Sequence, residues 1–422
     1  MTESRRERLA FLFVFVTVLF DMLAVGIIIP VLPNLILEFK GGSFTDAARL
    51  AGPLAALWSL MQFVFSPILG GLSDRFGRRP VILLSNAGLA LAYVVTAWAP
   101  TLIWFALGRV ISGISAASQS TAQAYIADTS PPEKRAGRYG MLGAAFALGF
   151  VLGPAIGGIV SDAYGLRAAI WLAAAMSAVN FCYGLFILPE SLPKERRRPF
   201  TLRQSNPLSA LRYLAGRKEL SGLSLAHLFH FLAQVVLPST FVLYAGYRFG
   251  WQGTSVGLLL ALVGLGGIVV QGFLVRPIVA RLGERKALLT GLACGAAAFF
   301  IYASAPIGPV LFVGVAFGAF WGLYGPSAQA LLTSRVDPTE QGKLQGALGA
   351  VSSMAGLIGP IVFTNVFAYF ISEAAPAQIP GAAFYLASVL LLSAAFIAWR
   401  AIRAEPPVAA TKAEGDAPAA TG

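Results

Sequence analysis

Charged residues are scarce in this chain of 422 residues. Asp, Glu, Lys and Arg together make up 12% of it, about half of the roughly 25% that soluble globular domains carry. Hydrophobic residues make up 57%, and the mean hydropathy is +0.73. This balance excludes a soluble domain with an apolar patch and predicts an integral membrane protein.

Cysteine and histidine are scarce as well, with two residues of each. Cys182 and Cys294 fall in separate apolar runs, where a thiol packs as a small hydrophobic group, so we expect no disulfide and no metal site. The sequence also lacks a phosphate-binding loop and a nucleophile paired with a base. We therefore expect neither an enzyme nor an ATP-driven pump, and no cofactor.

Long apolar runs are abundant. A helix of about 20 apolar residues crosses a hydrocarbon core of about 30 Å. Runs of this kind predict twelve transmembrane helices in two sets of six, near residues 9–33, 50–72, 80–98, 101–127, 137–160, 167–188, 220–247, 253–280, 286–305, 308–333, 343–370 and 380–400. The first run has no cleavage site typical of a signal peptide, so we expect it to stay in the membrane.

These runs give an all-α integral membrane fold of two pseudo-symmetric six-helix bundles. We expect an N-terminal bundle over residues 1–188, a basic cytoplasmic linker over 189–218, a C-terminal bundle over 219–403 and a disordered tail over 404–422. The tail is rich in Ala, Pro and Thr and has no apolar run, which is typical of disorder.

The net charge of +12 would suggest a nucleic-acid partner in a soluble protein, but here it is confined to particular loops. Cytoplasmic loops of membrane proteins carry an excess of Lys and Arg. The basic residues fall before the first helix and at even-to-odd helix junctions: Arg5, Arg6, Arg8, Arg75, Arg78, Arg79, Lys134, Arg135, Arg138, Lys194, Arg196, Arg197, Arg198, Arg281, Arg285 and Lys286. We therefore predict a multi-pass protein of the inner (plasma) membrane, in contact with lipid, with both termini cytoplasmic and no nucleic-acid partner.

The two halves of the sequence repeat each other. A shift of 206 residues superposes Gly77 on Gly283, Gly153 on Gly359 and Pro154 on Pro360. Two six-helix copies in one orientation indicate a parallel duplication, with a substrate site between the halves near the bilayer midplane. This architecture predicts alternating access by rocking of the halves.

Four motifs carry the resemblance of this chain to a known family. They are Gly71-x2-Asp74-Arg75-x-Gly77-Arg78-Arg79 between helices 2 and 3, Asp21-x4-Gly26-x3-Pro30-x2-Pro33 in helix 1, Leu107-Gly108-Arg109-x3-Gly113 in helix 4, and Gly149-x3-Gly153-Pro154-x2-Gly157-Gly158 in helix 5. In this order the chain resembles the major facilitator superfamily up to about residue 400. Within that superfamily it resembles the twelve-helix drug/proton antiporters, and among these the tetracycline/proton antiporters.

The resemblance implies that the loop between helices 2 and 3 is a conformational latch. In the family its Asp caps the start of helix 11 and its basic residues pair with an acid at the end of helix 4; here those residues are Asp74, Arg78 and Asp128. A carboxylate at a helix N-terminus is favourable by about 0.3 to 1 kcal/mol. The alternative is that the three arginines of the loop only fix the topology.

The glycine run in helix 5 corresponds to the antiporter motif of the family, formed here by Gly149, Gly153, Pro154, Gly157 and Gly158. It favours export over uptake. Close packing of helices through small residues, with a kink at Pro154, explains the same pattern equally well.

Two charges lie inside the apolar runs. Asp21 is 13 residues beyond Arg8, roughly 20 Å into the membrane, and Arg109 is eight residues beyond Thr101, about 12 Å from the opposite face. An intramembrane carboxylate is costly and indicates function. We interpret Asp21 as the proton-coupling acid and Arg109 as its electrostatic partner; a static ion pair between helices 1 and 4 is the alternative.

Helix 7 adds two histidines on one face. His227 aligns with Asp21 under the 206-residue shift and could take part in proton coupling, although it could equally line the interior as a polar group. The other candidates are predicted to bind substrate, and an aromatic residue among them could equally be packing: Gln62, His230, Gln234, Trp321, Tyr324 and Asn365. Gln62 matches a cavity position of the tetracycline exporters.

The resemblance fails at three positions. The tetracycline exporters carry acids in helices 3 and 9 and a histidine in helix 8, where this chain has Ala92, Gly295 and Gly267. We therefore expect a proton-coupled exporter of a lipophilic or amphipathic small molecule, working by alternating access, with a substrate other than tetracycline. An uptake permease or facilitator for a metabolite is the alternative, and the resemblance implies a monomer.

Overall fold

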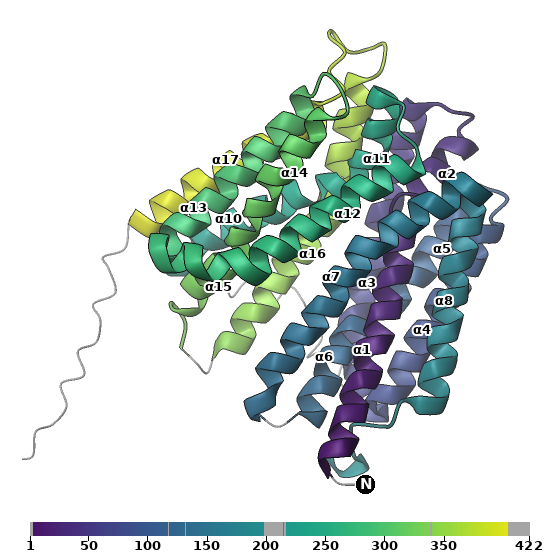
Figure 1. Ribbon diagram of the computed structural model, residues 1–422, viewed down its shortest axis with the longest axis vertical. Coiled ribbons are helices and arrows are strands. Elements are labelled where there is room, and N and C mark those ends of the chain that lie inside the picture. Colours follow the sequence, from purple (N-terminus) through teal and green to yellow (C-terminus); the bar gives the residue numbers. More distant parts are fainter. Residues whose placement is uncertain are drawn as a thin grey trace, which may run out of the picture.

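The computed structural model describes residues 3–116, 118–130, 132–197, 214, 217–337 and 340–403 (Figure 1). The described part of the chain contains helices and no strand, so the predicted all-α fold is confirmed. Most of the predicted linker 189–218 and all of the predicted tail 404–422 lie outside the described residues.

The first half of the chain forms one bundle. Its helices are α1 (Glu3–Ile28), α2 (Leu32–Phe39), α3 (Phe44–Phe76), α4 (Arg78–Trp98), α5 (Leu102–Ser115), α6 (Ser118–Thr129), α7 (Pro132–Tyr164) and α8 (Leu166–Ile187). A short 3₁₀ turn, η1 (Lys194–Arg196), follows at the start of the connection to the second half.

The second half forms the other bundle. Its elements are α10 (Lys218–Gln234), α11 (Val236–Phe249), α12 (Gly253–Val269), the π-helical turn η3 (Val270–Leu274), α13 (Val275–Ser304), α14 (Val310–Phe320), the 3₁₀ turn η4 (Trp321–Leu323), α15 (Tyr324–Thr333), α16 (Gln341–Phe370) and α17 (Ala382–Arg403).

These elements account for the twelve predicted crossings. Ten described helices are long and apolar enough to cross a membrane, and one of them, Gly253–Ser304, has 52 residues. It would be about 78 Å long if straight, but Gly283 interrupts it with a φ of 76°, so it folds back as two crossings. The shorter apolar helix α5 and the following helix α6 together supply the remaining crossing.

Glycine at equivalent places of the repeat turns the chain between crossings. Gly77 separates α3 from α4 with a φ of 108°, and Gly283, its partner under the 206-residue shift, has a φ of 76°. Residues with a Cβ rarely adopt this left-handed region, which explains glycine at both positions.

The two halves pack against each other at one end of the molecule. Below, the end that carries Arg75, Arg78 and Arg79 is called the basic end and the opposite end the far end. At the far end a Cβ on Gly52 of α3 would overlap the hydroxyl of Thr364 of α16, and a Cβ on Gly158 of α7 would overlap the backbone of Gly253 of α12. In Figure 1 the ribbons of the halves meet at the top and diverge toward the lower end, where the N-terminus lies.

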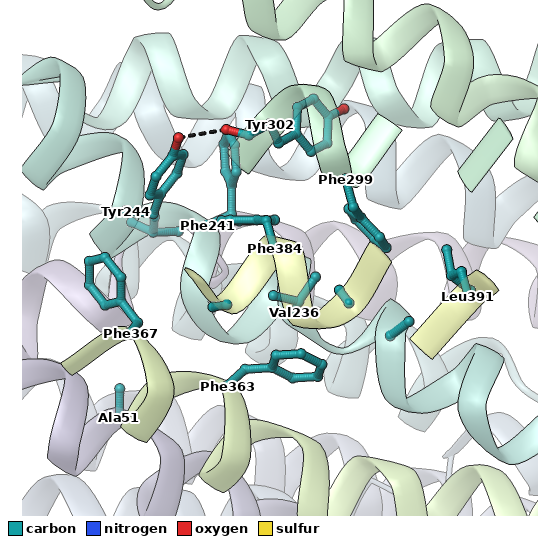
Figure 2. Packing of buried hydrophobic residues seen from close by; sticks show 14 of the residues in the cluster. Ala51, Val236, Phe241, Tyr244, Phe299, Tyr302, Phe363, Phe367, Phe384 and Leu391 are labelled. Atoms are coloured by element: carbon teal, nitrogen blue, oxygen red, sulfur yellow. Dashed lines mark hydrogen bonds between the residues drawn. The ribbon is translucent and has the colours of Figure 1, made fainter. Parts of the chain in front are cut away.

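An aromatic core fills the far end of the second half. Tyr244 donates a hydrogen bond of 2.6 Å to the carbonyl oxygen of Tyr302, and Phe241 and Phe384 pack between them (Figure 2). Ala51 of the first half belongs to the same buried cluster. The halves therefore share one continuous core at this end, which holds the far end closed.

Candidate functional site

A cavity of about 440 Å³ lies between the two halves. The first half contributes residues of α1, α2, α3, α4, α5 and α7, and the second half contributes Val235, Pro238, Ser239, Gly356 and Pro360. The lining is mostly apolar, with Trp58, Tyr93, Phe105 and Phe150 as its aromatic groups, and the charged residues among the described lining are Asp21 and Arg109. Such an enclosure suits an amphipathic small molecule.

Asp21 is held from behind the cavity. Its side chain lies on α1, is 2% exposed and lines the cavity. The amide Nδ2 of Asn180, on α8, donates to Oδ1 of Asp21 at 2.8 Å and to the carbonyl oxygen of Thr17 at 2.9 Å. Asn180 is fully buried and is not part of the cavity lining, so it fixes the carboxylate without occupying space for substrate.

Arg109 reaches the same cavity from α5. Its guanidinium lies 6.0 Å from the ring centroid of Phe105, and Tyr93 of α4 interacts electrostatically with both Arg109 and Asp21. Among the described residues, no ion pair joins Arg109 directly to Asp21. The structure thus brings the two predicted charges to one cavity, with Tyr93 close to both.

Of the predicted substrate residues, Gln62 lines the cavity. Gln234 and Asn365 are exposed and are not among the lining residues, and Nδ2 of Asn365 donates to the carbonyl oxygen of Ile361 on its own helix. His230, Trp321 and Tyr324 also lie outside the lining and form a separate cluster with His227.

This cluster joins α10 to the broken tenth crossing. Nε1 of Trp321 donates to Nδ1 of His230 at 3.1 Å, and the ring of His230 stacks on Tyr324 with centroids 3.8 Å apart. Nδ1 of His227 lies 3.1 Å from the hydroxyl of Tyr324. Because the indole N–H can only donate, His230 must be neutral with its proton on Nε2, whereas His227 can accept from the tyrosine or donate to it.

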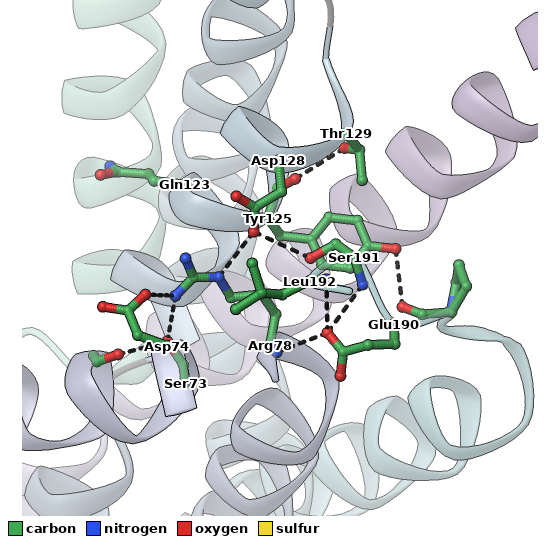
Figure 3. A network of polar contacts seen from close by, with 12 residues as sticks. Ser73, Asp74, Arg78, Gln123, Tyr125, Asp128, Thr129, Glu190, Ser191 and Leu192 are labelled. Carbon is green, nitrogen blue, oxygen red and sulfur yellow. Dashed lines mark hydrogen bonds and ion pairs between the residues drawn. The ribbon is translucent and has the colours of Figure 1, made fainter. Parts of the chain in front are cut away.

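The predicted latch is half formed. Arg78, which is 8% exposed, donates through Nε to Asp128 at 2.9 Å and through a terminal nitrogen to Ser73 at 2.7 Å, and it also pairs with Asp74 (Figure 3). The expected pair of Arg78 with the acid at the end of the fourth crossing is therefore present.

The other half of the latch is not formed in this conformation. Asp74 pairs with Arg78, and the residue at the start of α16 is Glu340, with no side-chain cap on that helix. Glu340 instead pairs with Arg217 at the start of α10. Since the halves pack at the far end, the basic end of α16 is not brought onto the 2–3 loop.

Glu190 extends the latch to the start of the linker. Its Oε1 accepts the backbone N–H of Arg78 at 2.8 Å and those of Ser191 and Leu192 at 3.0 Å (Figure 3). This carboxylate caps the N-terminus of α4, where a negative charge is favourable. A Cβ on Gly77 would overlap the carboxylate, so the glycine of the motif makes room for Glu190.

The remaining basic residues of the motif have separate roles. Arg79 donates to the carbonyl oxygen of Leu185, and Arg75 is exposed beside Phe76, with its guanidinium 5.1 Å from the ring centroid. Gly71 lies near the end of α3 and is partly buried. These side chains tie the loop to α8 and to its own helix end.

The glycines of the antiporter motif face two different helices. A Cβ on Gly149 would overlap Met22, one on Gly153 would overlap Gly26, and one on Gly157 would overlap Ile27, all on α1. Gly158 faces Gly253, and the carbonyl of Pro154 faces Gly257, both on α12 of the other half. The motif thus packs α7 tightly between α1, beside Asp21, and α12.

Sequence reasoning missed Asn180, Tyr93 and Glu190. An amide within the sixth apolar run could have indicated a role for Asn180, and the Pro-Glu-Ser segment after that run could have indicated one for Glu190. Tyr93 carried no signal, because a tyrosine within an apolar run is ordinary packing.

Comparison with known proteins agrees with this geometry. The family model of the Major Facilitator Superfamily matches residues 14–223 and 223–421. The tetracycline resistance protein, class C, of Escherichia coli is 37% identical over 371 residues, which cover 88% of this chain and 93% of that protein. Its class E counterpart, also from Escherichia coli, is 36% identical over 363 residues, covering 83% of this chain and 86% of that protein.

Solved structures share the fold. The crystal structure of the human organic anion transporter MFSD10 superposes with a TM-score of 0.69 at 28% identity, covering 93% of this chain and 99% of that one. The predictions of a twelve-helix transporter fold and of a chain that is not an enzyme are confirmed by these relatives. Two matched halves, a cavity between them and relatives that cover nearly the whole chain place this protein in the Major Facilitator Superfamily.

Proposed function

We propose that this transporter is a proton-coupled antiporter that exports an amphipathic small molecule. The observation that carries the proposal is Asp21, a carboxylate 2% exposed, which lines a mostly apolar cavity between the halves. Tetracycline resistance proteins with 37% and 36% identity over most of the chain support export as the direction. Proton coupling through an intramembrane acid is the chemistry that such a residue supplies.

The mechanism follows from competition at Asp21. A substrate that uses the carboxylate, as a cation or a hydrogen-bond donor, lowers the affinity of Asp21 for a proton, and the proton lowers the affinity for substrate by the same factor. Either the substrate or the proton is then bound at Asp21 while the halves rock between a conformation with the far end closed and a conformation with the basic end closed. Arg109, which lies close to Tyr93 in the same cavity, stabilises the ionised carboxylate of Asp21 after the substrate has left.

The orientation of the protein in the membrane is part of the proposal. We place the basic end on the cytoplasmic side of an inner membrane, because Arg75, Arg78 and Arg79 lie there and cytoplasmic loops are rich in Arg and Lys. The closed far end then leaves the cavity to the cytoplasm, which is the state that takes up a compound for export. The boundaries 1–188, 189–218, 219–403 and 404–422, contact with lipid and a monomeric state belong to the same proposal.

The substrate differs from tetracycline in this proposal. The acids that the tetracycline exporters carry in helices 3 and 9 are replaced by Ala92, which is fully buried, and by Gly295, on which a Cβ would overlap Trp321. Neither position can present a carboxylate to a cation complex. An apolar molecule with one polar or cationic group fits the cavity better.

We propose that the histidine cluster forms a second, accessory proton site. His227 can hold a proton on Nδ1 and still keep its contact with Tyr324, so we propose it as an accessory proton group. His230, Trp321 and Tyr324 then act by holding α10 to the tenth crossing. Gln234 and Asn365 reach substrate only in another conformation of the halves.

One observation favours uptake as a second candidate. The relative whose structure superposes at 28% identity is described as an organic anion transporter, and Arg109 is the one cationic group of the cavity lining. An anion bound beside Asp21 would raise the affinity of Asp21 for a proton, which couples the two in symport rather than antiport. The charge of the substrate therefore decides the direction.

Transport in liposomes with a trapped pH dye tests the proposal. The wild type is compared with Asp21→Asn and with Asp46→Asn, an exposed carboxylate in the first turn of α3, against lipophilic cations, neutral drugs, organic anions and tetracycline. Proton movement opposite to the compound, lost in Asp21→Asn and kept in Asp46→Asn, would support antiport. Proton movement in the same direction as an anion, or compound flux that survives in Asp21→Asn, would overturn it.

A further inference from the structure

A group of buried polar side chains lies behind Asp21, on the side away from the cavity. Thr17 of α1, Asn86 of α4, and Ser177 and Asn180 of α8 are at most 3% exposed, and none of them lines the cavity. The proposed exchange of substrate and proton in the cavity does not use them. Polar groups at this depth in a membrane helix are costly and call for a role.

The helix register brings these side chains together. Asn180 contacts Thr17 and Asp21 directly. A Cβ on Gly184 of α8 would lie 3.0 Å from the side chain of Leu83 on α4. Helices α4 and α8 run antiparallel, so Asn86, three positions after Leu83 on α4, lies level with Asn180, four positions before Gly184 on α8. Ser177 lies one further turn before Asn180, on the same face of α8.

Several atoms of this group have no hydrogen-bond partner among the described residues. They are Oγ1 of Thr17, both Nδ2 and Oδ1 of Asn86, Oγ of Ser177 and Oδ1 of Asn180. Buried polar atoms of folded proteins are nearly always bonded to protein or to ordered water. A ligand that can both donate and accept, and is small enough to fit between packed helices, is water.

We propose that Asn86, Ser177 and Asn180 form an internal water site behind Asp21, through which Asp21 exchanges its proton separately from the substrate cavity. The inference rests on the proposed function, in which Asp21 is the proton-coupling acid. The protonated carboxyl gives its proton to a water oxygen and becomes the carboxylate that Nδ2 of Asn180 stabilises. Asn86 lies eight residues into α4 from Arg78, about 12 Å from the basic end, so the water site leads toward that end.

The charged and titratable groups that face Asp21 are few. Tyr93 on α4 and Arg109 on α5 face it across the cavity. At its level α7 presents Gly149 to the neighbouring Met22, and α8 presents Asn180, neither of which titrates. Among the described residues that surround it, therefore, the route behind Asp21 contains no competing acid or base.

The physical advantage of a second route is that substrate does not block it. A bound molecule in a cavity of 440 Å³ covers the front of Asp21, whereas water behind Asn180 stays in place. The proton can then leave while substrate enters, so the exchange needs no state in which both are absent. Bridging water can pass a proton from the carboxyl group toward the next hydrogen-bonding side chain.

Time-resolved infrared spectroscopy of the purified protein in lipid nanodiscs tests the inference. The carboxyl band of Asp21 is isolated by subtracting the spectrum of Asp21→Asn, and its protonation is followed after a pH jump with the cavity occupied by a lipophilic cation that the transport assay has identified, or by tetraphenylphosphonium if none has been found. Asn86→Leu, similar in volume and apolar, should slow protonation of Asp21 about tenfold or more. Asn86→Ser should restore most of the rate, because the hydroxyl can again bind water.

Ser177→Ala and Ser304→Ala complete the set. Ser177→Ala removes one group of the water site with little change in volume and should also slow protonation, which keeps the test decisive if Asn86→Leu does not fold. Ser304→Ala removes an exposed hydroxyl of α13 that donates to the carbonyl oxygen of Phe300 on its own helix, and it should have no effect. Wild-type rates in folded Asn86→Leu and Ser177→Ala would overturn the water site while leaving Asp21 as the coupling acid. Normal proton-driven transport by Asp21→Asn would instead overturn the proposed function itself.

Discussion

Gly158 of α7 and Gly253 of α12 meet across the interface between the halves, so closely that a Cβ on either would overlap the backbone of the other. Beside them Oδ2 of Asp162 accepts the backbone N–H of Thr254 at 2.7 Å. This pair lies at the far end, and the first of the two glycines belongs to the antiporter motif. The motif therefore contributes directly to the closure of one end of the transporter.

Replacement of Gly158 by Val is expected to open the far end. The added side chain cannot fit against Gly253, so the conformation with a closed far end loses stability relative to the conformation with a closed basic end. Distances between spin labels at the far ends of α7 and α12 should increase, and transport should fall. Gly143→Val is the matched control, since a Cβ at Gly143 of the same helix meets nothing within 4 Å. Unchanged distances in Gly158→Val would contradict this role for the motif.

Arg78→Lys is expected to destabilise the fold of the first half. The guanidinium makes separate contacts with Asp74, Ser73 and Asp128 that an ammonium group cannot reproduce at once. Hydrogen bonds to charged groups contribute about 1.5 to 3 kcal/mol each, and the partial exposure of Asp128 reduces this, so we expect a loss of about 1 to 2 kcal/mol. Thermal unfolding in detergent measures it.

Arg75→Lys is the control for this prediction. Arg75 belongs to the same motif but is exposed and lies beside Phe76. Its replacement should leave the unfolding temperature nearly unchanged. Unchanged stability in both variants would show that the motif acts through its net charge alone, which lysine preserves, as a topology signal would.

Much of the fold could be predicted from the sequence because the bilayer imposes it. Apolar runs long enough to span it must be helices, so the crossings near residues 80–98 and 167–188 appear almost unchanged as α4 and α8. The repeat also carried structural information, since Gly77 and Gly283 share a positive φ. The interruptions at Val270–Leu274 and Trp321–Leu323 were not predictable, because the hydropathy of those segments is continuous.

The site was predictable only in part. A charged residue inside an apolar run is easily recognised in the sequence, and Asp21 and Arg109, recognised in this way, line one cavity. Which side chain holds a charge depends on helix packing, so the contact of Asn180 with Asp21 across 159 positions could not be read from spacing. The same reason explains why His230 and Trp321, chosen as substrate residues, bond to each other outside the cavity lining.

The contact between His227 and Tyr324 allows a double-variant test of the accessory proton group. His227→Gln and Tyr324→Phe each remove one side of the contact of 3.1 Å, so each should reduce proton-driven transport to a similar extent. The double variant should be no worse than either, because groups that act through one contact are not additive. Initial rates in vesicles measure this, with Tyr369→Phe on the exposed face of α16 as control. Additive losses would separate the roles of the two residues.

Glu190→Ala is expected to release the start of the linker from the latch. Its Oε1 accepts three backbone N–H groups, one of them at the first residue of α4, and loss of a helix cap costs about 0.5 to 2 kcal/mol. Thermal unfolding should show this loss, whereas Glu195→Ala, which removes an exposed acid five residues further on, should leave the stability unchanged.

Glu190→Ala should also lower the turnover of transport more than the affinity for the compound, because Glu190 lies on the network around Arg78 and outside the cavity lining. A change confined to affinity would place the effect of Glu190 in substrate binding and contradict its role as a cap. Gly77 leaves room for this carboxylate and has a φ of 108°, so Gly77→Ala should destabilise the protein at least as much as Glu190→Ala, because it displaces the acid and also strains the backbone.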